Sequence, residues 1–185
     1  KNMAYNLTGF KQGLKDVEEW LKKELATVRT GRANLSILDS VSVEAYGSFM
    51  PINQVANLSM EDARTVRIAP WDTSVTKDVE KAIVASDLGL SVTVDDKGLR
   101  VIFPELTGER RISLVKLTKQ KLEDAKITLR GEREKTLKDL EAKEKDGEMS
   151  EDEKFRTKAE VQKLLDECTR NLESLFEKKE KEISE

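Results

Sequence analysis

Apolar residues recur every three or four positions over the first thirty residues, which is the period of an amphipathic helix. This stripe predicts a helix over about residues 3–30, and Gly31 directly afterwards is a typical helix stop. The stripe consists of Leu7, Phe10, Leu14, Val17, Leu21, Leu25 and Val28.

Residues 31–104 follow a different period. Val41, Val43 and Ala45 alternate with polar residues, as expected for a half-buried strand. Further strands are predicted over 55–58, 65–69, 90–94 and 99–103, with a helix over 74–85. Turns are predicted at Tyr46-Gly47-Ser48 and at the hairpin signal Asp95-Asp96-Lys97-Gly98. This block therefore predicts a small β/α/β domain.

The helical period returns after Pro104. Thr107 is a candidate N-cap for a second helix that runs to about residue 145, where Asp146-Gly147 ends it. Ser150 and Glu153 fit a capping box for a third helix. The apolar stripe of this third helix consists of Phe155, Val161, Leu165, Cys168, Leu172 and Leu175.

Short connections make neighbouring helices antiparallel. We therefore predict an α+β fold with two domains. Residues 1–30 and 105–185 form an elongated antiparallel three-helix bundle, and residues 31–104 form the inserted β/α/β domain.

Charged residues make up 37% of the 185-residue chain and aromatic residues only 5%, which suits long solvated helices. The net charge of −3 argues against a uniformly basic nucleic-acid binder. Charge is nevertheless uneven. Residues 108–138 carry 10 basic and 5 acidic side chains, whereas residues 141–185 carry 10 basic and 15 acidic ones. The basic excess on the second helix indicates an electrostatic footprint.

Five basic residues of the second helix fall within an arc of about 100° on an ideal helix. They are Lys116, Lys119, Lys126, Arg130 and Arg133. An apolar seam of Leu122, Ala125, Leu129 and Leu140 adjoins this arc. Such an arc could follow the phosphates of RNA. Alternatively, it is a solvated face that pairs with Glu123 and with the acidic third helix.

Paired arginines flank the inserted block: Arg29 and Arg32 before it, Arg110 and Arg111 after it. Arg29 ends a helix, where a cation also favours the helix dipole. Arg32 lies in a linker and has no such role, so the four arginines indicate contact with a polyanion. The chain crosses between the two periodicities only at these linkers, which predicts a hinge there. Its residues are Gly31, Ala33, Pro104, Glu105, Leu106 and Thr107.

The chain contains no histidine and a single cysteine, which excludes imidazole chemistry and an intrachain disulfide. Cys168 lies on an apolar stripe and is expected to be a core thiol. No glycine-rich phosphate loop follows a strand, and Asp95 and Asp96 read as turn residues. We expect no enzyme activity, no cofactor and no metal.

No apolar run is long enough to span a membrane. We expect a cytoplasmic protein of bacterial type. Because the sequence starts at Lys1, an organellar origin with a removed leader stays open. The competing class is a helical scaffold or chaperone-like protein. Co-sedimentation with ribosomes distinguishes the two, because only RNA binding should weaken steeply as the salt concentration rises.

Several motifs resemble those of the ribosome recycling factor family, in order along nearly the whole chain. They are Val28-Arg29-Thr30-Gly31-Arg32-Ala33-Asn34, Ala45-Tyr46-Gly47, Pro51-Ile52-Asn53-Gln54-Val55-Ala56, Ala63-Arg64-Thr65, Glu80-Lys81-Ala82-Ile83, Ala85-Ser86-Asp87-Leu88-Gly89-Leu90, Pro104-Glu105-Leu106-Thr107 and Glu109-Arg110-Arg111.

This resemblance implies an L-shaped monomer that is not an enzyme. It implies that the bundle binds ribosomal RNA of the large subunit on the post-termination ribosome. Elongation factor G then uses GTP hydrolysis to drive the hinged domain and split the ribosome into subunits. The family's bundle arginines correspond to Arg29, Arg32, Arg110, Arg130 and Arg133.

One stretch of the second helix departs from the family pattern. Where the family usually has an Arg-Asn-x-Arg-Arg-Asp-like run, this chain has Arg130-Gly131-Glu132-Arg133-Glu134. Glu134 replaces the second arginine of a pair, and Gly131 costs about 1 kcal/mol against alanine in a helix interior. RNA contacts near residue 134, and compatibility with a foreign elongation factor G, are where differences are expected.

Overall fold

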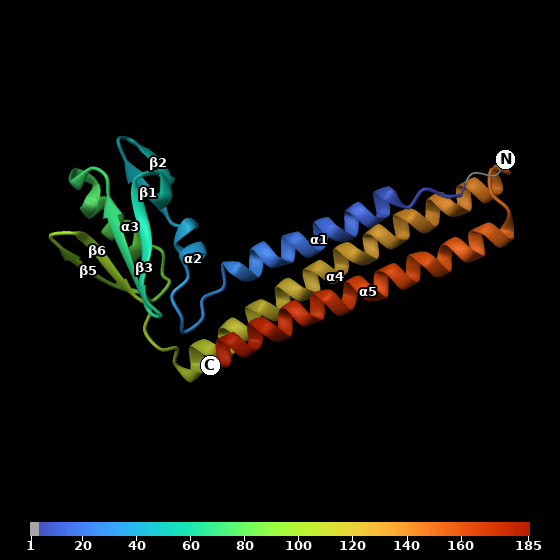
Figure 1. Ribbon diagram of the computed structural model, residues 1–185. Helices are drawn as coiled ribbons and strands as arrows, with labels where there is room; N and C mark the ends of the chain where they lie inside the picture. The colour runs from blue at the N-terminus through green and yellow to red at the C-terminus, as the bar shows by residue number, and fades with distance from the viewer. Residues whose placement is uncertain (1–3) are drawn as a thin grey trace. The chain divides into compact units, whose positions relative to one another are not determined.

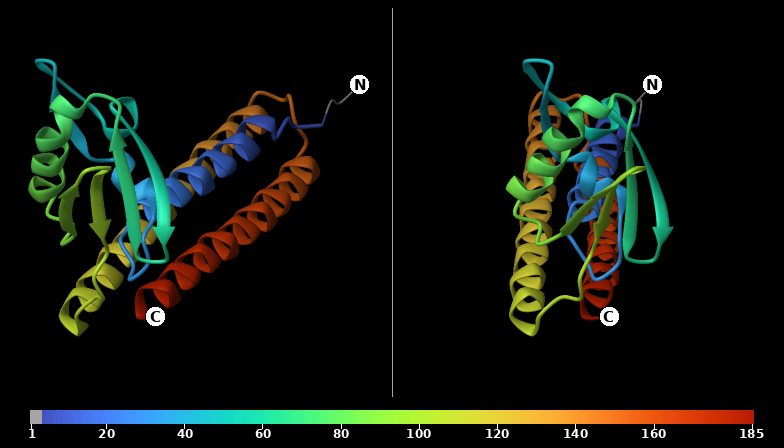
Figure 2. Two further views of the ribbon diagram at one scale, coloured as in Figure 1. Left: turned by 60° about the vertical axis from the view of Figure 1, so that its left-hand side comes forward. Right: turned by 90° about the vertical axis from the view of Figure 1, so that its left-hand side faces the viewer.

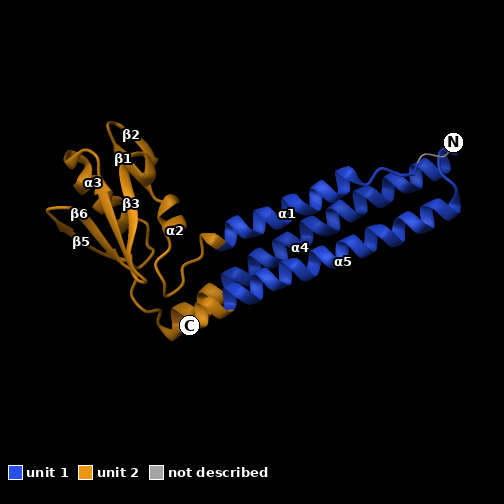
Figure 3. Ribbon diagram, viewed as in Figure 1, with its two compact units in different colours: residues 1–25, 116–180 blue, residues 26–115, 181–185 orange. Residues whose placement is uncertain are grey.

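The computed structural model describes residues 4–185, which form three long helices and a set of short strands (Figure 1). The long helices are α1 (Thr8–Ala26), α4 (Gly108–Lys145) and α5 (Glu151–Ser184). The chain divides into two compact units (Figure 3). Unit 1 comprises residues 1–25 and 116–180, and unit 2 comprises residues 26–115 and 181–185.

Unit 1 is a bundle of three helical segments, with α4 antiparallel to α1 and α5 (Figure 1). The predicted apolar stripes meet in one core, because residues three and four apart share a helix face. It contains Phe10, Leu14, Val17, Leu21, Leu25, Leu122, Ala125, Leu129, Val161, Leu165, Cys168 and Leu172. The sequence therefore predicted the bundle core correctly.

The starts of α4 and α5 agree with the predicted caps, whereas α1 ends at Ala26, four residues before the predicted end at about residue 30. The Glu153 backbone N donates to Ser150 Oγ at 3.1 Å, and the Arg110 backbone N donates to Thr107 Oγ1 at 3.1 Å. The first helix begins later than predicted, at Thr8, where the Thr8 backbone N donates to Asn6 Oδ1 at 3.0 Å. The predicted start at Met3 lies outside the described residues.

One residue of the predicted stripe on α5 was misplaced. Phe155 is 75% exposed. Phe155 precedes Val161 by six residues, which is about 120° off the buried face at 100° per residue. The stripe of α5 therefore begins at Val161.

Unit 2 is built on a four-stranded antiparallel sheet in the order β3-β4-β6-β5. The strands are β3 (Ala56–Asp62), β4 (Thr65–Pro70), β5 (Ser91–Asp95) and β6 (Gly98–Ile102). β1 (Ser42–Ala45) and β2 (Ser48–Pro51) form a separate hairpin. A short 3-10 turn η2 (Thr73–Val75) leads into α3 (Thr76–Ala85), the helix between β4 and β5 (Figure 2).

The core of unit 2 lies on one face of this sheet. Val66, Ile68, Leu99 and Val101 point inward from β4 and β6, and Val79 and Ile83 of α3 pack into the same core. Gly98 is required at the β5–β6 turn, because its φ is +128° and a Cβ there would lie 2.3 Å from the Ile68 carbonyl oxygen.

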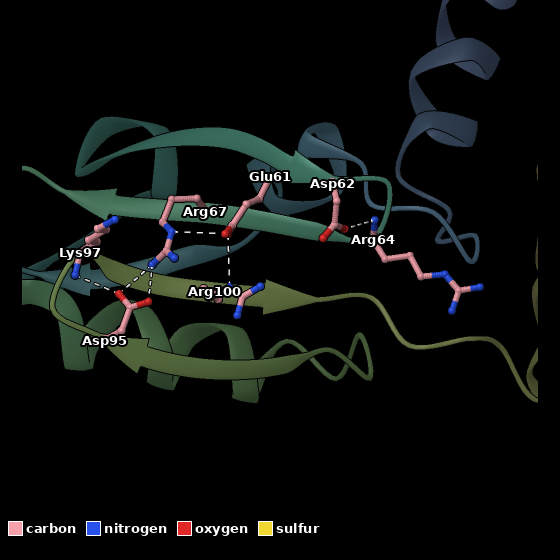
Figure 4. A network of polar contacts seen from close by, with 7 residues as sticks. All are labelled: Glu61, Asp62, Arg64, Arg67, Asp95, Lys97 and Arg100. Atoms are coloured by element: carbon pink, nitrogen blue, oxygen red, sulfur yellow. Dashed lines mark hydrogen bonds and ion pairs between the residues drawn. The ribbon is translucent and has the colours of Figure 1, made fainter.

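The opposite face of the sheet carries a charged network (Figure 4). Arg67 of β4 lies directly opposite Arg100 of β6 in the strand register. Glu61 approaches both arginines, at 3.6 Å from Arg67 Nε and 3.3 Å from Arg100 Nε. Asp95 accepts two bonds from Arg67 Nη1 at 2.7 and 2.8 Å. The carboxylates offset the repulsion that two opposed arginines would otherwise cause.

Three short elements were not predicted: α2 (Leu35–Asp39), β2 and the 3-10 turn η1 (Ile52–Gln54). α2 has only five residues, too few to show a helical period. In β2, Phe49 is 70% exposed, so the strand lacks the alternating burial that marks a strand in sequence.

A small cluster of Val28, Leu106, Leu114 and Ile183 is buried within unit 2. This cluster packs the segment after α1 against the first turns of α4 and the end of α5 within unit 2. The domain limits at 30/31 and 104/105 that the linkers indicate remain a prediction.

Candidate nucleic-acid interface

α4 supplies most of the candidate RNA-binding residues. It runs uninterrupted for 38 residues without a proline, and it buries Leu122, Ala125, Leu129 and Leu140. Burial of this seam fixes the rotation of α4 about its axis. The basic residues that adjoin the seam are thereby held at defined positions on the bundle surface.

Within unit 1, the five basic residues of the predicted arc differ in their surroundings. Lys116, Lys119 and Arg130 are exposed and form no ion pair within residues 4–185. Lys126 is half-buried, and its Nζ lies 3.1 Å from Glu173 Oε1 on α5. Arg133 is half-buried, and its Nε is buried without a hydrogen-bond partner in the described chain.

The alternative interpretation, pairing with neighbouring helices, therefore holds for Lys126. It also holds for Lys121, which lies outside the predicted arc and pairs with Glu24 of α1 at 2.6 Å. Lys116, Lys119 and Arg130 are the members of the arc whose charge is available to a partner.

Unit 2 contains the four arginines that flank the inserted block. Arg32 and Arg110 are exposed, and Arg111 is half-buried with its Nε enclosed. Arg29 differs from the expectation of a surface contact, because it is only 5% exposed. Its guanidinium donates to the carbonyl oxygens of Leu88 and Pro104.

The residues of the predicted hinge are unequally restrained within unit 2. Gly31 is half-buried, and a Cβ there would meet nothing within 4 Å. The Ala33 backbone N donates to the Ala63 carbonyl oxygen at 2.8 Å. Leu106 is buried, whereas Pro104, Glu105 and Thr107 are exposed.

Glu105 is nevertheless held in place. Arg64 Nη2 donates to Glu105 Oε1 at 2.8 Å, and this bond lowers the pKa of the carboxyl, with the Arg64 charge adding to the effect. The return linker is thus held by a side-chain ion pair at Glu105.

Other expectations from the sequence concern reactive groups. Cys168 is 3% exposed, as expected for a core thiol, and burial raises its pKa to about 12. Asp95 accepts from the Lys97 backbone N at 2.9 Å, as expected for a turn residue. Among residues 4–185, no three His, Cys, Asp or Glu side chains gather as metal ligands would. In the same part of the chain, no helix is both long and apolar enough to cross a membrane.

Sequence reasoning did not single out some exposed apolar residues. Ile127 is 59% exposed on α4, about 80° from Lys119 on the helix. In unit 2, Tyr46 is 67% and Phe49 70% exposed at the β1–β2 hairpin, where both line an open groove beside α3. These residues lie off the apolar stripes that predict burial. Their only signal in the sequence is that they are large apolar residues at positions where the pattern predicts polar ones.

The long-helix bundle, its exposed cations and the small antiparallel sheet unit define a class of two-unit α+β proteins. A family model described as ribosome recycling factor matches residues 21–183. The chain belongs to the ribosome recycling factor family. Two curated ribosome-recycling factors show how similar the family members are. That of Caldicellulosiruptor bescii is 44% identical over 99% of this chain and 100% of its own length. That of Bacillus subtilis is 43% identical over 97% of each.

Solved structures show the same likeness. The solution structure of a ribosome recycling factor is 34% identical, with a TM-score of 0.73 over 98% of this chain and 99% of its own. A second chain is 39% identical, with a TM-score of 0.64 over 95% of each. It belongs to models for the T. thermophilus ribosome recycling factor and the E. coli elongation factor G bound to the E. coli post-termination complex. Family membership and the α+β fold therefore agree with the sequence prediction.

Proposed function

We propose that this chain is a translation factor that binds the post-termination ribosome. With elongation factor G, and with GTP hydrolysis by that partner, it splits the ribosome into subunits for a new round of protein synthesis. The observation that carries this proposal is the family match over residues 21–183. A 39%-identical relative described together with elongation factor G and the post-termination complex supports the choice of partners.

The binding surface on the large subunit is ribosomal RNA, contacted through basic side chains. Phosphate contacts need exposed cations, and each one displaces counterions from the RNA. The candidates are Arg32, Arg110, Arg111, Lys116, Lys119, Lys126, Arg130 and Arg133. Lys116, Lys119 and Arg130 are the strongest of these, because they are exposed and unpaired in the described chain. Arg29 is left out of this set of candidates because its side chain is buried.

The chain itself acts as a monomer and catalyses no reaction. It contributes binding and transmits force, whereas elongation factor G hydrolyses the GTP. The two linkers form the hinge at which the inserted domain is driven. A few linker residues are enough to absorb a domain rotation, and Gly31 has the conformational freedom for it.

Gly131 and Glu134 modify the RNA surface of α4. Both are exposed, and a Cβ on Gly131 would meet nothing within 4 Å. Glu134 places a negative charge one residue from Arg133, where the family usually has a second arginine. We expect weaker RNA contact around residue 134 and a preference for the cognate elongation factor G.

A subunit-splitting assay tests the function. Post-termination ribosomes are mixed with this protein, cognate elongation factor G and GTP, and free subunits are measured by light scattering and sucrose-gradient sedimentation. Splitting should need all three components and should stop when a non-hydrolysable GTP analogue replaces GTP. Ribosomes that remain intact with the complete mixture would refute the proposal.

A further inference from the structure

Arg29 is a buried cation that joins three segments of unit 2. Its Nη1 donates to the Leu88 carbonyl oxygen at 3.2 Å, and its Nη2 donates to the Pro104 carbonyl oxygen. The guanidinium carbon lies 5.8 Å from the centroid of the Phe103 ring, within reach of a cation–π contact. Arg29 thus reaches from the linker after α1 to the turn before β5 and to the segment after β6.

The turn before β5 is shaped to accommodate this side chain. Asp87 and Gly89 both have positive φ, at 56° and 70°, and they present the Leu88 carbonyl oxygen between them. A Cβ on Gly89 would lie 3.3 Å from Arg29 Nη1, closer than most side chains tolerate. The contact with Arg29 therefore explains why the turn Ser86-Asp87-Leu88-Gly89 has this backbone conformation and a glycine at position 89.

Electrostatics distinguish Arg29 from a residue poised for RNA. Within residues 4–185, its partners are two carbonyl oxygens and a ring, and its Nε is buried without a hydrogen bond. Burial lowers the pKa of Arg29, and the positive charge of Arg110 adds to this effect. A phosphate contact requires accessible N–H groups, which the exposed Arg32 has and the buried Arg29 lacks.

We propose that Arg29 is an internal clamp that fastens the linker after α1 to the Leu88 turn and to the Pro104 return segment, and that it does not contact RNA. By holding Pro104, it positions Thr107, the N-cap of α4, and the first turn that carries Arg110. Arginine suits this role because its planar fork offers donors in two directions, which a lysine ammonium on one stem cannot reproduce.

Hydrogen exchange of the isolated protein tests the clamp directly. Arg29→Lys keeps the charge but cannot reach both carbonyls. Backbone amides at Gly89, Leu90, Glu105 and Leu106 should exchange about tenfold faster, as expected for a lost charged hydrogen bond. Amides of the β4–β6 pair should keep their protection. Arg32→Lys is the matched control and should change none of these rates. Unaltered exchange at residues 89–90 and 105–106 in Arg29→Lys would overturn the clamp.

A double-mutant cycle provides a second test that does not depend on hydrogen exchange. Gly89→Ala and Gly47→Ala both impose strain at a positive φ, of 70° and 79°, but only Gly89 has Arg29 beside it. The loss of melting temperature should be larger for Gly89→Ala in the parent protein. In the Arg29→Lys background the two losses should become more alike, because contacting residues couple and distant ones add. An unchanged difference would argue that Arg29 and the turn act independently.

The second part of the proposal, that Arg29 does not contact RNA, rests on the proposed function and is tested by a separate experiment. Large-subunit binding is measured over a range of salt concentrations for Arg29→Gln and Arg32→Gln. Arg32→Gln should lower the salt slope by about one unit, and Arg29→Gln should leave the slope unchanged. A slope lowered equally by Arg29→Gln would show that Arg29 touches RNA. Failure of the parent protein to bind would refute the proposed function instead, and the exchange experiment would still decide on the clamp.

Discussion

At the scale of single residues, surroundings separate basic side chains that look equivalent in the sequence. Lys126 and Arg130 lie one helical turn apart, but Lys126 pairs with Glu173 whereas Arg130 is exposed and unpaired within the described residues. The charge of Lys126 is thereby balanced within the bundle. A free cation on a rigid helix, by contrast, keeps its charge for a partner.

Arg130→Ala should weaken binding to the large ribosomal subunit and leave the fold intact. The side chain is exposed, so its loss removes a phosphate contact but no packing. The salt slope of binding should fall by about one unit. The measurement is co-sedimentation at several salt concentrations, with circular dichroism to monitor helicity. Arg170→Ala, an exposed arginine on α5, is the control and should bind as the parent does. Equal binding by both variants would contradict the assignment of Arg130.

Gly131→Ala should stabilise the protein. Gly131 lies in the interior of α4, and an added Cβ would meet nothing within 4 Å. Alanine should therefore add about 1 kcal/mol by reducing the freedom of the unfolded chain. Urea unfolding measures this change. Gly9→Ala, at the start of α1 and equally open, should gain less because helix ends fray. A loss of stability in Gly131→Ala would mean that α4 needs glycine there.

At the scale of elements, the sequence predicted the features that depend on local periodicity and on local turn and cap residues. The stripes of α1 and α4, the capping by Ser150 and the hairpin at Gly98 all follow from local patterns. The 3.6-residue period also located the cationic arc. It could not show that Arg29 is buried, because its partners, Leu88 and Pro104, are 59 and 75 residues away in sequence. Nor could it show that Lys126 has a partner on α5.

The charged face of the sheet predicts a pH dependence of stability. The hydrogen bond from Arg67 lowers the pKa of Asp95 below its ordinary value of 3.8. Its stabilising contribution is therefore complete above the unfolded-state pKa and is lost as pH falls through the folded-state pKa. Asp95→Asn should lower the melting temperature at neutral pH, and the difference from the parent should shrink below about pH 4.

Asp96→Asn is the matched control for Asp95→Asn. Asp96 lies in the same turn and makes no hydrogen bond to Arg67 in the described structure. It should show a smaller loss of melting temperature at neutral pH. A difference between parent and Asp95→Asn that stays constant from pH 7 to pH 2 would show that the carboxylate charge is not what stabilises the sheet.

At the scale of the whole molecule, the chain combines a bundle that carries free cations with a sheet unit that has a separate core. The sheet core and the bundle core share no residues, so a change at the linkers, which lie inside unit 2, does not require either core to repack. In the proposed mechanism, binding and splitting are therefore separable properties. RNA contacts determine the first, and the conformational freedom of the linkers determines the second.

Gly31→Ala should separate these two properties. Gly31 does not have a positive φ, and a Cβ there would meet nothing within 4 Å, so alanine fits the present conformation. Stability should not fall and should rise slightly, because alanine reduces the freedom of the unfolded chain, and large-subunit binding should stay at the parent level. Splitting with elongation factor G and GTP should slow several-fold, because alanine forbids backbone angles that glycine permits.

Gly108→Ala is the control for this variant, since its Cβ also meets nothing within 4 Å but lies in the first turn of α4. It should split ribosomes at the parent rate. The measurement is the rate of subunit release at saturating factor, which removes any difference in affinity. If Gly31→Ala also splits at the parent rate, this linker does not need glycine's additional conformations. The hinge motion would then have to occur at the return linker, where Glu105 is tied to Arg64.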